Sequence, residues 1–295
     1  LRWFTFGISY EMYGKDLIES AQLSAQIVRA LGGEPPIGLF YEMFLDEEGK
    51  KISKSVGKGI SVDGWQRYAP VESLLAFLYQ NPRKAKRLHY DTIPQFTDQY
   101  LKQLADWSGQ SAEEQLWNPS YFYFDEVRPR WDAAVNYTLV RNLVVCMGKD
   151  DPEVVLDYLA RYDGRVLDAD HAPLARSLVR GAIAYDKEFE AGDRQRSAAP
   201  PELRPLIALL ADELDAAAAA GLADQAEVQS LGFTVAREAG VDAGAFFQAI
   251  YRGLIGQDRG PRFGSFMLAL GLAEGAAALR RLADLLPRQR GRRHR

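Results

Sequence analysis

The sequence predicts a small α/β segment followed by an all-helical remainder. Residues 1–60 contain strand, helix and strand signals in that order, which is typical of an α/β layer. From residue 63 onward strand signals largely disappear, and apolar residues recur at the helical spacings of three and four. The chain of 295 residues is long enough for roughly two domains of about 150 residues each.

The α/β segment is predicted from three local patterns. Apolar residues follow a helical period over 17–31, and Gly32 and Gly33 end that pattern. The apolar run 37–45 predicts a strand, and the turn signal 46–49 follows it. The apolar and aromatic residues 1–8 lack the cleavage site of a signal peptide and are typical of the middle of a folded domain.

The remainder of the chain is expected to be helical with one interruption. We expect helices over 71–80 and 92–106, and a linker over 107–130 that is rich in aromatic, proline and acidic residues. The helices expected after this linker cover about 132–146, 152–162, 171–191, 201–221, 224–239, 243–254 and 264–286.

Composition excludes some classes of protein and site. Hydrophobic residues make up 47% and charged residues 26%, as in an ordinary soluble globular protein, and no run of about 18 apolar residues predicts a membrane span. Cys146 is the one cysteine, so we expect core packing and an intracellular compartment for it rather than a disulfide. The three histidines share no metal-ligand spacing, so no metal site is expected.

Charge gives a weaker indication of a partner. The formal net charge of −4 argues against nucleic-acid binding through global charge, but local basic clusters still bind phosphates. One such cluster comprises Arg83, Lys84, Lys86 and Arg87, and a second is the tail 288–295. The alternatives are a solvated helix face for the first cluster and a disordered tail for the second.

The sharpest chemical feature is the run 51–55, Lys-Ile-Ser-Lys-Ser, with Gly57 and Gly59 after it. Lysine ammonium groups neutralise phosphate charge, while hydroxyl groups and loop amides donate hydrogen bonds, so this loop suits a triphosphate. Glycines allow the backbone to approach a ligand closely. Taken alone, the run is equally compatible with an exposed basic loop.

The run 51–55 resembles the Lys-Met-Ser-Lys-Ser signature of class I aminoacyl-tRNA synthetases, with Ile52 in place of Met. The same enzymes carry a Gly-x-Asp sequence on the preceding strand–helix unit, which Gly14 and Asp16 match. Within class I the chain resembles lysyl-tRNA synthetases of the bacterial type. The segments that carry this likeness are 10–18, 31–36, 41–46, 68–74, 84–88 and 254–266, with 117–119 between them.

Three departures from the family accompany the likeness. Val56 stands where the family has lysine and Lys58 appears two positions later, while Ser9 stands where an acidic residue is expected. No histidine lies in the His-Ile-Gly-His context by which class I enzymes also hold ATP. We therefore expect the chain to resemble the C-terminal portion of such an enzyme, without the N-terminal half of the catalytic domain.

The resemblance implies an architecture in three parts. Residues 1–62 would be the end of a Rossmann-type catalytic domain, 63–200 a helical stem or cage region, and 201–295 a helical region that binds the tRNA anticodon. The fold class is then an α/β remnant of a class I catalytic domain followed by an all-α tRNA-binding region.

The resemblance also implies a reaction and its residues. Lysine and ATP would give lysyl-adenylate, and the lysyl group would pass to tRNA(Lys). Lys54 and Lys51 would be catalytic, and the residues that would bind ATP are Lys54, Ser53, Ser55, Gly14 and Asp16. The tRNA contacts would come from Arg83, Lys84, Lys86 and Arg87.

ATP would be a substrate, and its Mg²⁺ would be held mostly by phosphates. Lysine and tRNA(Lys) would be the partners, with no DNA and no membrane, in the cytoplasm. Two alternatives stay open. One is a non-catalytic helical tRNA-binding module derived from a synthetase, and the other is a synthetase of the glutamyl or glutaminyl type.

Overall fold

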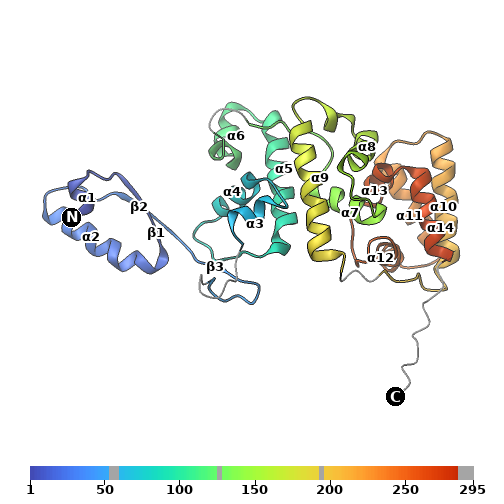
Figure 1. Ribbon diagram of the computed structural model, residues 1–295, viewed down its shortest axis with the longest axis horizontal. Coiled ribbons are helices and arrows are strands. Elements are labelled where there is room, and N and C mark those ends of the chain that lie inside the picture. The colour runs from blue at the N-terminus through green and yellow to red at the C-terminus, as the bar shows by residue number, and fades with distance from the viewer. Residues whose placement is uncertain (53–59, 125–127, 193–195, 285–295) are drawn as a thin grey trace, which may run out of the picture. The chain divides into compact units, whose positions relative to one another are not determined.

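A computed structural model describes residues 1–52, 60–124, 128–192 and 196–284 (Figure 1). Its contacts divide the chain into two compact units. Unit 1 comprises Leu1–Gln66, Val71–Gln103 and Gln110–Glu126, and unit 2 comprises Arg67–Pro70, Leu104–Gly109 and Val127–Arg295. These units follow from contact density. The functional division at residues 62 and 200 stays a prediction.

The first part of unit 1 is a strand–helix–strand crossover. The elements are α1 (Arg2–Thr5), β1 (Tyr10–Gly14), η1 (Lys15–Leu17), α2 (Ile18–Ala30) and β2 (Ile37–Tyr41). Strands β1 and β2 pair in parallel, with Tyr10 opposite Ile37 and Gly14 opposite Tyr41. Gly32 has a φ of +81°, a left-handed value that glycine adopts without steric cost, and it comes directly after Leu31, the C-cap of α2. The helix predicted over 17–31 is therefore confirmed.

The strand predicted over 37–45 is two strands. After β2 the chain leaves the first sheet, and β3 (Phe44–Leu45) pairs in parallel with β4 (Lys86–Arg87). The turn after β3 has the predicted chemistry, because Asp46 Oδ1 accepts hydrogen bonds from the backbone N–H groups of Glu48 and Lys50. After this turn, Lys51 forms an isolated antiparallel β-bridge with Leu45.

The helical part of unit 1 contains α3 (Val62–Gln66), α4 (Val71–Tyr79), η3 (Tyr90–Thr92), α6 (Ala112–Trp117) and η4 (Pro119–Phe122), together with the start of α5 (Ile93–Gly109). Trp65 is fully buried, and its Nε1 donates a hydrogen bond of 2.8 Å to Ser73 Oγ. The ring of Phe77 packs on Trp65 and, edge to face, on Phe96. These aromatic contacts form the core of this part.

The expected linker 107–130 is partly helical, which corrects the prediction. Helix α5 continues to Gly109, and α6 and η4 follow within the same stretch. The reason is local capping. Ser111 and Glu114 form a reciprocal capping box at the start of α6, and Asn118 caps η4, in which Pro119 is the first residue.

The described residues of unit 2 form helices and connecting loops, with no strand among them. Its elements are α7 (Tyr137–Met147), α8 (Pro152–Tyr162), η5 (Gly164–Leu167), α9 (Ala172–Tyr185), η6 (Asp186–Glu190), α10 (Arg204–Ala219), α11 (Gln225–Glu238), α12 (Ala243–Leu254), α13 (Phe263–Leu270) and α14 (Leu272–Asp284). Side-chain N-caps begin several of them, including Asn136, Asp151, Asp224 and Asp242. The one helix predicted over 264–286 is wrong, because Gly271, with a φ of +86°, separates α13 from α14.

Close helix packing in unit 2 depends on glycine. A Cβ atom added to Gly181 of α9 would overlap the carbonyl oxygen of Tyr68, and one added to Gly264 of α13 would overlap that of Gln225. Tyr137 Oη donates to the same Tyr68 carbonyl oxygen at 2.6 Å. At both glycines, therefore, the backbone of one segment lies directly against the backbone of another.

No single helix among the described residues is long and apolar enough to cross a membrane. The bent pair α13 and α14, which meet at 107°, passes that test by length and composition only when the two helices are taken together.

Candidate functional site

The structure brings together the two motifs that the sequence singled out. Asp16 follows β1, and Lys51 follows the turn after β3, yet Lys51 Nζ lies 2.9 Å from Asp16 Oδ2. Because β1 and β2 are parallel, their carboxyl ends meet at one edge of the sheet, where open α/β sheets bind ligands. The ion pair therefore joins the Gly-x-Asp segment to the beginning of the lysine-serine loop.

A second ion pair lies beside the first. Lys15 Nζ is 2.7 Å from Glu42 Oε1, and Glu42 comes directly after β2. The hydrogen bond from Lys51 lowers the pKa of Asp16, and the hydrogen bond from Lys15 lowers the pKa of Glu42. Each carboxylate is thus held in its charged form beside an ammonium group. The sequence motif included Lys15 but did not predict Glu42 as its partner.

Gly14 occupies the end of β1 without a steric need for glycine. Its φ is −65°, and an added Cβ would meet Tyr41 at 3.8 Å, an ordinary contact. The protein itself therefore leaves room for a larger residue here.

The central residues of the predicted loop lie outside the described part of the chain. These are Ser53, Lys54 and Ser55, with the positions up to Gly59. The structure places the start of the loop through Ile52, whose backbone N–H donates to the Phe44 carbonyl oxygen at 3.1 Å. The roles predicted for the loop side chains stay predictions.

The basic cluster is not a helix face, and its four members differ. The segment forms a turn followed by β4, so the helix-face alternative is wrong. Arg83, Lys84 and Arg87 are exposed, and the guanidinium of Arg83 lies over the ring of Phe40 at 5.3 Å. Lys86 is half-buried.

Lys86 is engaged by the protein itself. Its Nζ donates to the carbonyl oxygens of Phe77 at 2.6 Å and Leu78 at 3.0 Å, near the end of α4, and lies over the Phe77 ring. A cation at a helix C-terminus satisfies carbonyl groups that lack partners within the helix. Burial lowers the pKa of Lys86 to about 8. Two of its three N–H donors are thus committed within the protein, which leaves one for its predicted phosphate contact.

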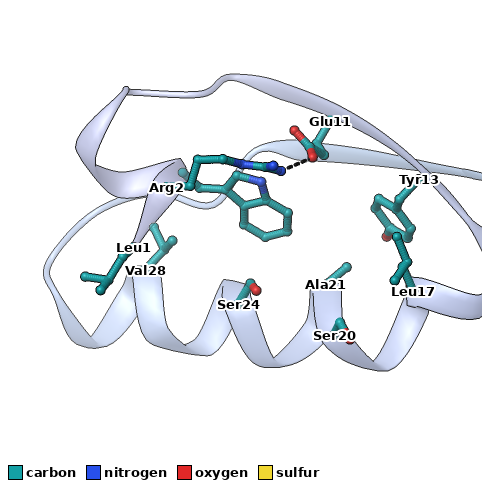
Figure 2. Close-up of a pocket in the computed structure, with 10 residues that line it drawn as sticks. Leu1, Arg2, Glu11, Tyr13, Leu17, Ser20, Ala21, Ser24 and Val28 are labelled. Carbon is teal, nitrogen blue, oxygen red and sulfur yellow. Dashed lines mark hydrogen bonds and ion pairs between the residues drawn. The ribbon is translucent and has the colours of Figure 1, made fainter.

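Two cavities in unit 1 were not predicted from the sequence. One, of about 290 Å³, lies between β1 and α2, with the ion pair between Arg2 and Glu11 on its wall and Tyr13 beside Leu17 at one end (Figure 2). The other, of about 350 Å³, is more apolar, and its lining includes Tyr10, Tyr41, Tyr79 and Lys84. The second depends on contacts between segments far apart in sequence, which local patterns do not reveal.

The described residues offer no resident metal site. Among them, no group of three or more His, Cys, Asp or Glu side chains could hold a metal ion.

Comparison with known proteins finds a family match for the first part of the chain. Residues 1–125 match the family model of tRNA synthetases class I (K). Lysine–tRNA ligases from Rickettsia bellii and Rickettsia conorii are each 36% identical to the chain over 93% of its length. The chain spans about half the length of these curated relatives, 52% in both cases.

The chain also aligns with a solved structure of a glutamate tRNA ligase from Elizabethkingia meningosepticum in complex with its amino acid. The alignment covers 97% of this chain and 59% of the ligase chain. The identity is 14% and the TM-score 0.36, which supports no conclusion about fold or function. The family model and the Rickettsia relatives confirm the resemblance inferred from the motifs: residues 1–125 match the class I (K) tRNA synthetases, and 93% of the chain is similar to lysine–tRNA ligases.

Proposed function

We propose that this chain carries part of the ATP site of a lysine–tRNA ligase, together with helices that bind the tRNA. The observation that supports this most strongly is the ion pair between Asp16 and Lys51, because it joins two motifs 35 positions apart at the carboxyl edge of parallel strands. The matched family and relatives support lysine as the amino acid and tRNA(Lys) as the acceptor.

The reaction has two transfers. A carboxylate oxygen of lysine attacks the α-phosphorus of ATP, the bond to the bridging oxygen breaks, and pyrophosphate leaves. A hydroxyl group at the tRNA 3′ end then attacks the lysyl carbonyl carbon, AMP leaves with the bonding electron pair, and the hydroxyl proton is released. Mg²⁺, bound mostly by the phosphates, would neutralise part of their charge.

The loop residues would act on the first transfer. Lys54 would stabilise the negative charge that grows on the departing pyrophosphate, and Lys51 would assist it, positioned by Asp16. Ser53 and Ser55 would order the loop, and Gly14 would let the adenosine or the aminoacyl group approach the strand end. This division gives Asp16 a positioning role and leaves the chemistry to the lysines.

The helical remainder would bind the sugar-phosphate backbone of the tRNA. Arg83, Lys84 and Arg87 are exposed and suited to phosphate contacts, whereas Lys86 would support the turn that presents them. Duplex RNA offers shape and phosphates more than readable base edges, so such contacts should dominate there. We place the catalytic remnant at 1–62, the stem or cage region at 63–200 and the anticodon-binding region at 201–295.

The test is amino-acid-dependent exchange of pyrophosphate into ATP by the gene product that contains this chain. We expect exchange with lysine and none with glutamate or glutamine. Exchange with glutamate would favour the glutamyl-type alternative. Salt-sensitive tRNA binding without exchange would favour the non-catalytic tRNA-binding module.

A further inference from the structure

Unit 1 exposes a patch of aromatic side chains that its own core does not use. Trp117 is 83% exposed, Phe122 59%, Tyr79 55% and Tyr121 45%. They come from three adjoining elements, α4, α6 and η4, of which α4 and η4 are in contact. Contiguous exposed apolar surface of this kind marks an interaction site more often than chance exposure does.

The rings of this aromatic patch are ordered relative to one another. Phe122 stacks on Tyr79 with ring centroids 6.0 Å apart and planes within 6°, and Tyr121 meets Phe122 edge to face at 5.2 Å. Buried Asn118 fixes the turn beneath them, because its Nδ2 donates to the Gln103 carbonyl oxygen and to Gln110 Oε1, each at 2.9 Å. Three of the four rings, those of Tyr79, Tyr121 and Phe122, are therefore held against one another.

Positive charge lies next to the aromatic patch. Tyr79 lines the apolar cavity of about 350 Å³ together with Lys84 and Lys86, and Arg83 is exposed beside them in the sequence. Of the acidic residues nearby, Glu42 lines the same cavity and pairs with Lys15, and Glu114 on α6 forms the capping box at Ser111, while Glu113 on α6 is exposed. A ligand with both flat rings and negative charge would match this combination of side chains.

We propose that the aromatic patch binds unpaired nucleotides of an RNA, whose bases stack on Trp117 and Phe122 while Arg83 and Lys84 meet the adjoining phosphates. Single-stranded segments expose base faces that a duplex hides, and aromatic side chains stack on those faces in many RNA-binding proteins. The proposal rests on the proposed function for its choice of RNA over a protein partner, and adjacent cations favour the same choice.

The test uses the 295-residue chain and three probes: a labelled single-stranded oligoadenylate, a blunt RNA duplex of equal length and a tRNA(Lys) transcript. Trp117→Ala combined with Phe122→Ala should weaken binding of the single strand by about 30-fold or more, since two stacking contacts are lost and each contributes at least about 5-fold. The dependence of affinity on salt should not change, because no ionic contact is lost. Duplex affinity should also stay at the parent value.

Two variants separate stacking from a structural effect. Trp117→Phe combined with Phe122→Tyr keeps aromatic faces and should bind the single strand within about 3-fold of the parent. Leu116→Ala removes an exposed apolar side chain that is not aromatic, and it should bind as the parent does.

A third variant tests the ionic contacts. Arg83→Ala combined with Lys84→Ala should weaken binding of all three probes and flatten the salt dependence of the affinity.

The outcomes distinguish this proposal from the proposed function. Parent-like single-strand affinity in the double alanine variant would overturn the stacking surface even if pyrophosphate exchange were present. The same variant losing self-association instead of RNA affinity would make the patch a protein interface and overturn it too. A third outcome is that the double alanine variant loses affinity for the single strand alone, in a protein whose parent shows no pyrophosphate exchange. That result would support the stacking surface and contradict the proposed function.

Discussion

Helices α2 and α9 have nearly the same length and very different surroundings. Among the 13 residues of α2 two are buried, Ala21 and Val28, whereas α9 buries nine of its 14. Both show an apolar stripe at helical spacing, yet Leu23 and Ile27 of α2 are exposed. Within unit 2 burial of apolar surface stabilises the helices, while in residues 1–52 the described polar contacts at the strand ends are surface ion pairs.

The largest effect on stability should come from truncating the core of unit 2. Phe266 on α13 is fully buried, so Phe266→Ala should cost about 3–5 kcal/mol of unfolding free energy through lost burial and a cavity. The matched control is Phe233→Ala, which removes a half-exposed ring from α11 and should cost roughly 1 kcal/mol or less. Urea unfolding of both variants measures the difference, and equal costs would remove the contrast between core and surface.

A smaller loss of stability should follow from adding one methyl group where a helix touches the backbone of another segment. Gly181→Ala would press a Cβ onto the Tyr68 carbonyl oxygen, and overpacking of this kind costs about 1–3 kcal/mol. Gly109→Ala, at a helical glycine with nothing within 4 Å of the added atom, should be neutral or slightly stabilising. Thermal melts of the pair test the close approach, which a stable Gly181 variant would contradict.

Because Lys86 is half-buried, the stability of unit 1 should depend on pH. Its pKa in the folded chain is about 8, below the ordinary value near 10.4, so the unfolded chain binds more protons between those limits. The parent should therefore gain stability relative to Lys86→Met as pH rises from about 8 to 10, and the difference between them should be constant below pH 7. Urea midpoints at pH 7 and pH 10 measure it, and a parallel response of both proteins would contradict the assignment.

The smallest effect should come from the exposed ion pair itself. In a double-mutant cycle with Asp16→Asn and Lys51→Met, the coupling should be weak and should fade with added salt. Because the pKa of Asp16 is lowered by the hydrogen bond from Lys51, this coupling is present at neutral pH and is lost as pH falls through that lowered pKa. Strong coupling insensitive to salt would contradict a surface pair.

Sequence patterns predicted the features that depend on neighbouring residues. The α2 helix, the turn at Asp46 and the helices α8 and α11 were predicted from local signals. The break at Gly271 was missed because apolar residues continue the helical period on both sides of it. The local signals for α6 and η4 were present in the expected linker, but its many aromatic and proline residues were read as irregular chain.

The candidate site shows the same limit. Asp16 and Lys51 were both predicted, because each belongs to a motif with its own chemistry. The engagement of Lys86 with the carbonyl groups of α4 could not be predicted, since it depends on a fold that brings β4 beside that helix. Exposure of the patch around Trp117 likewise depends on which residues the core leaves uncovered.

The measurement that tests the central claim most directly is single-turnover formation of lysyl-adenylate by the gene product that contains this chain. Lys54→Ala should lower that rate by about 10²–10³, or about 2.7–4 kcal/mol, with little change in lysine affinity, because Lys54 would meet charge that grows only in the transition state. Lys58→Ala should fall between the parent and Lys54→Ala if Lys58 replaces the lysine absent at position 56. An unchanged adenylation rate in a folded Lys54→Ala protein would contradict the assignment of this loop to the ATP site.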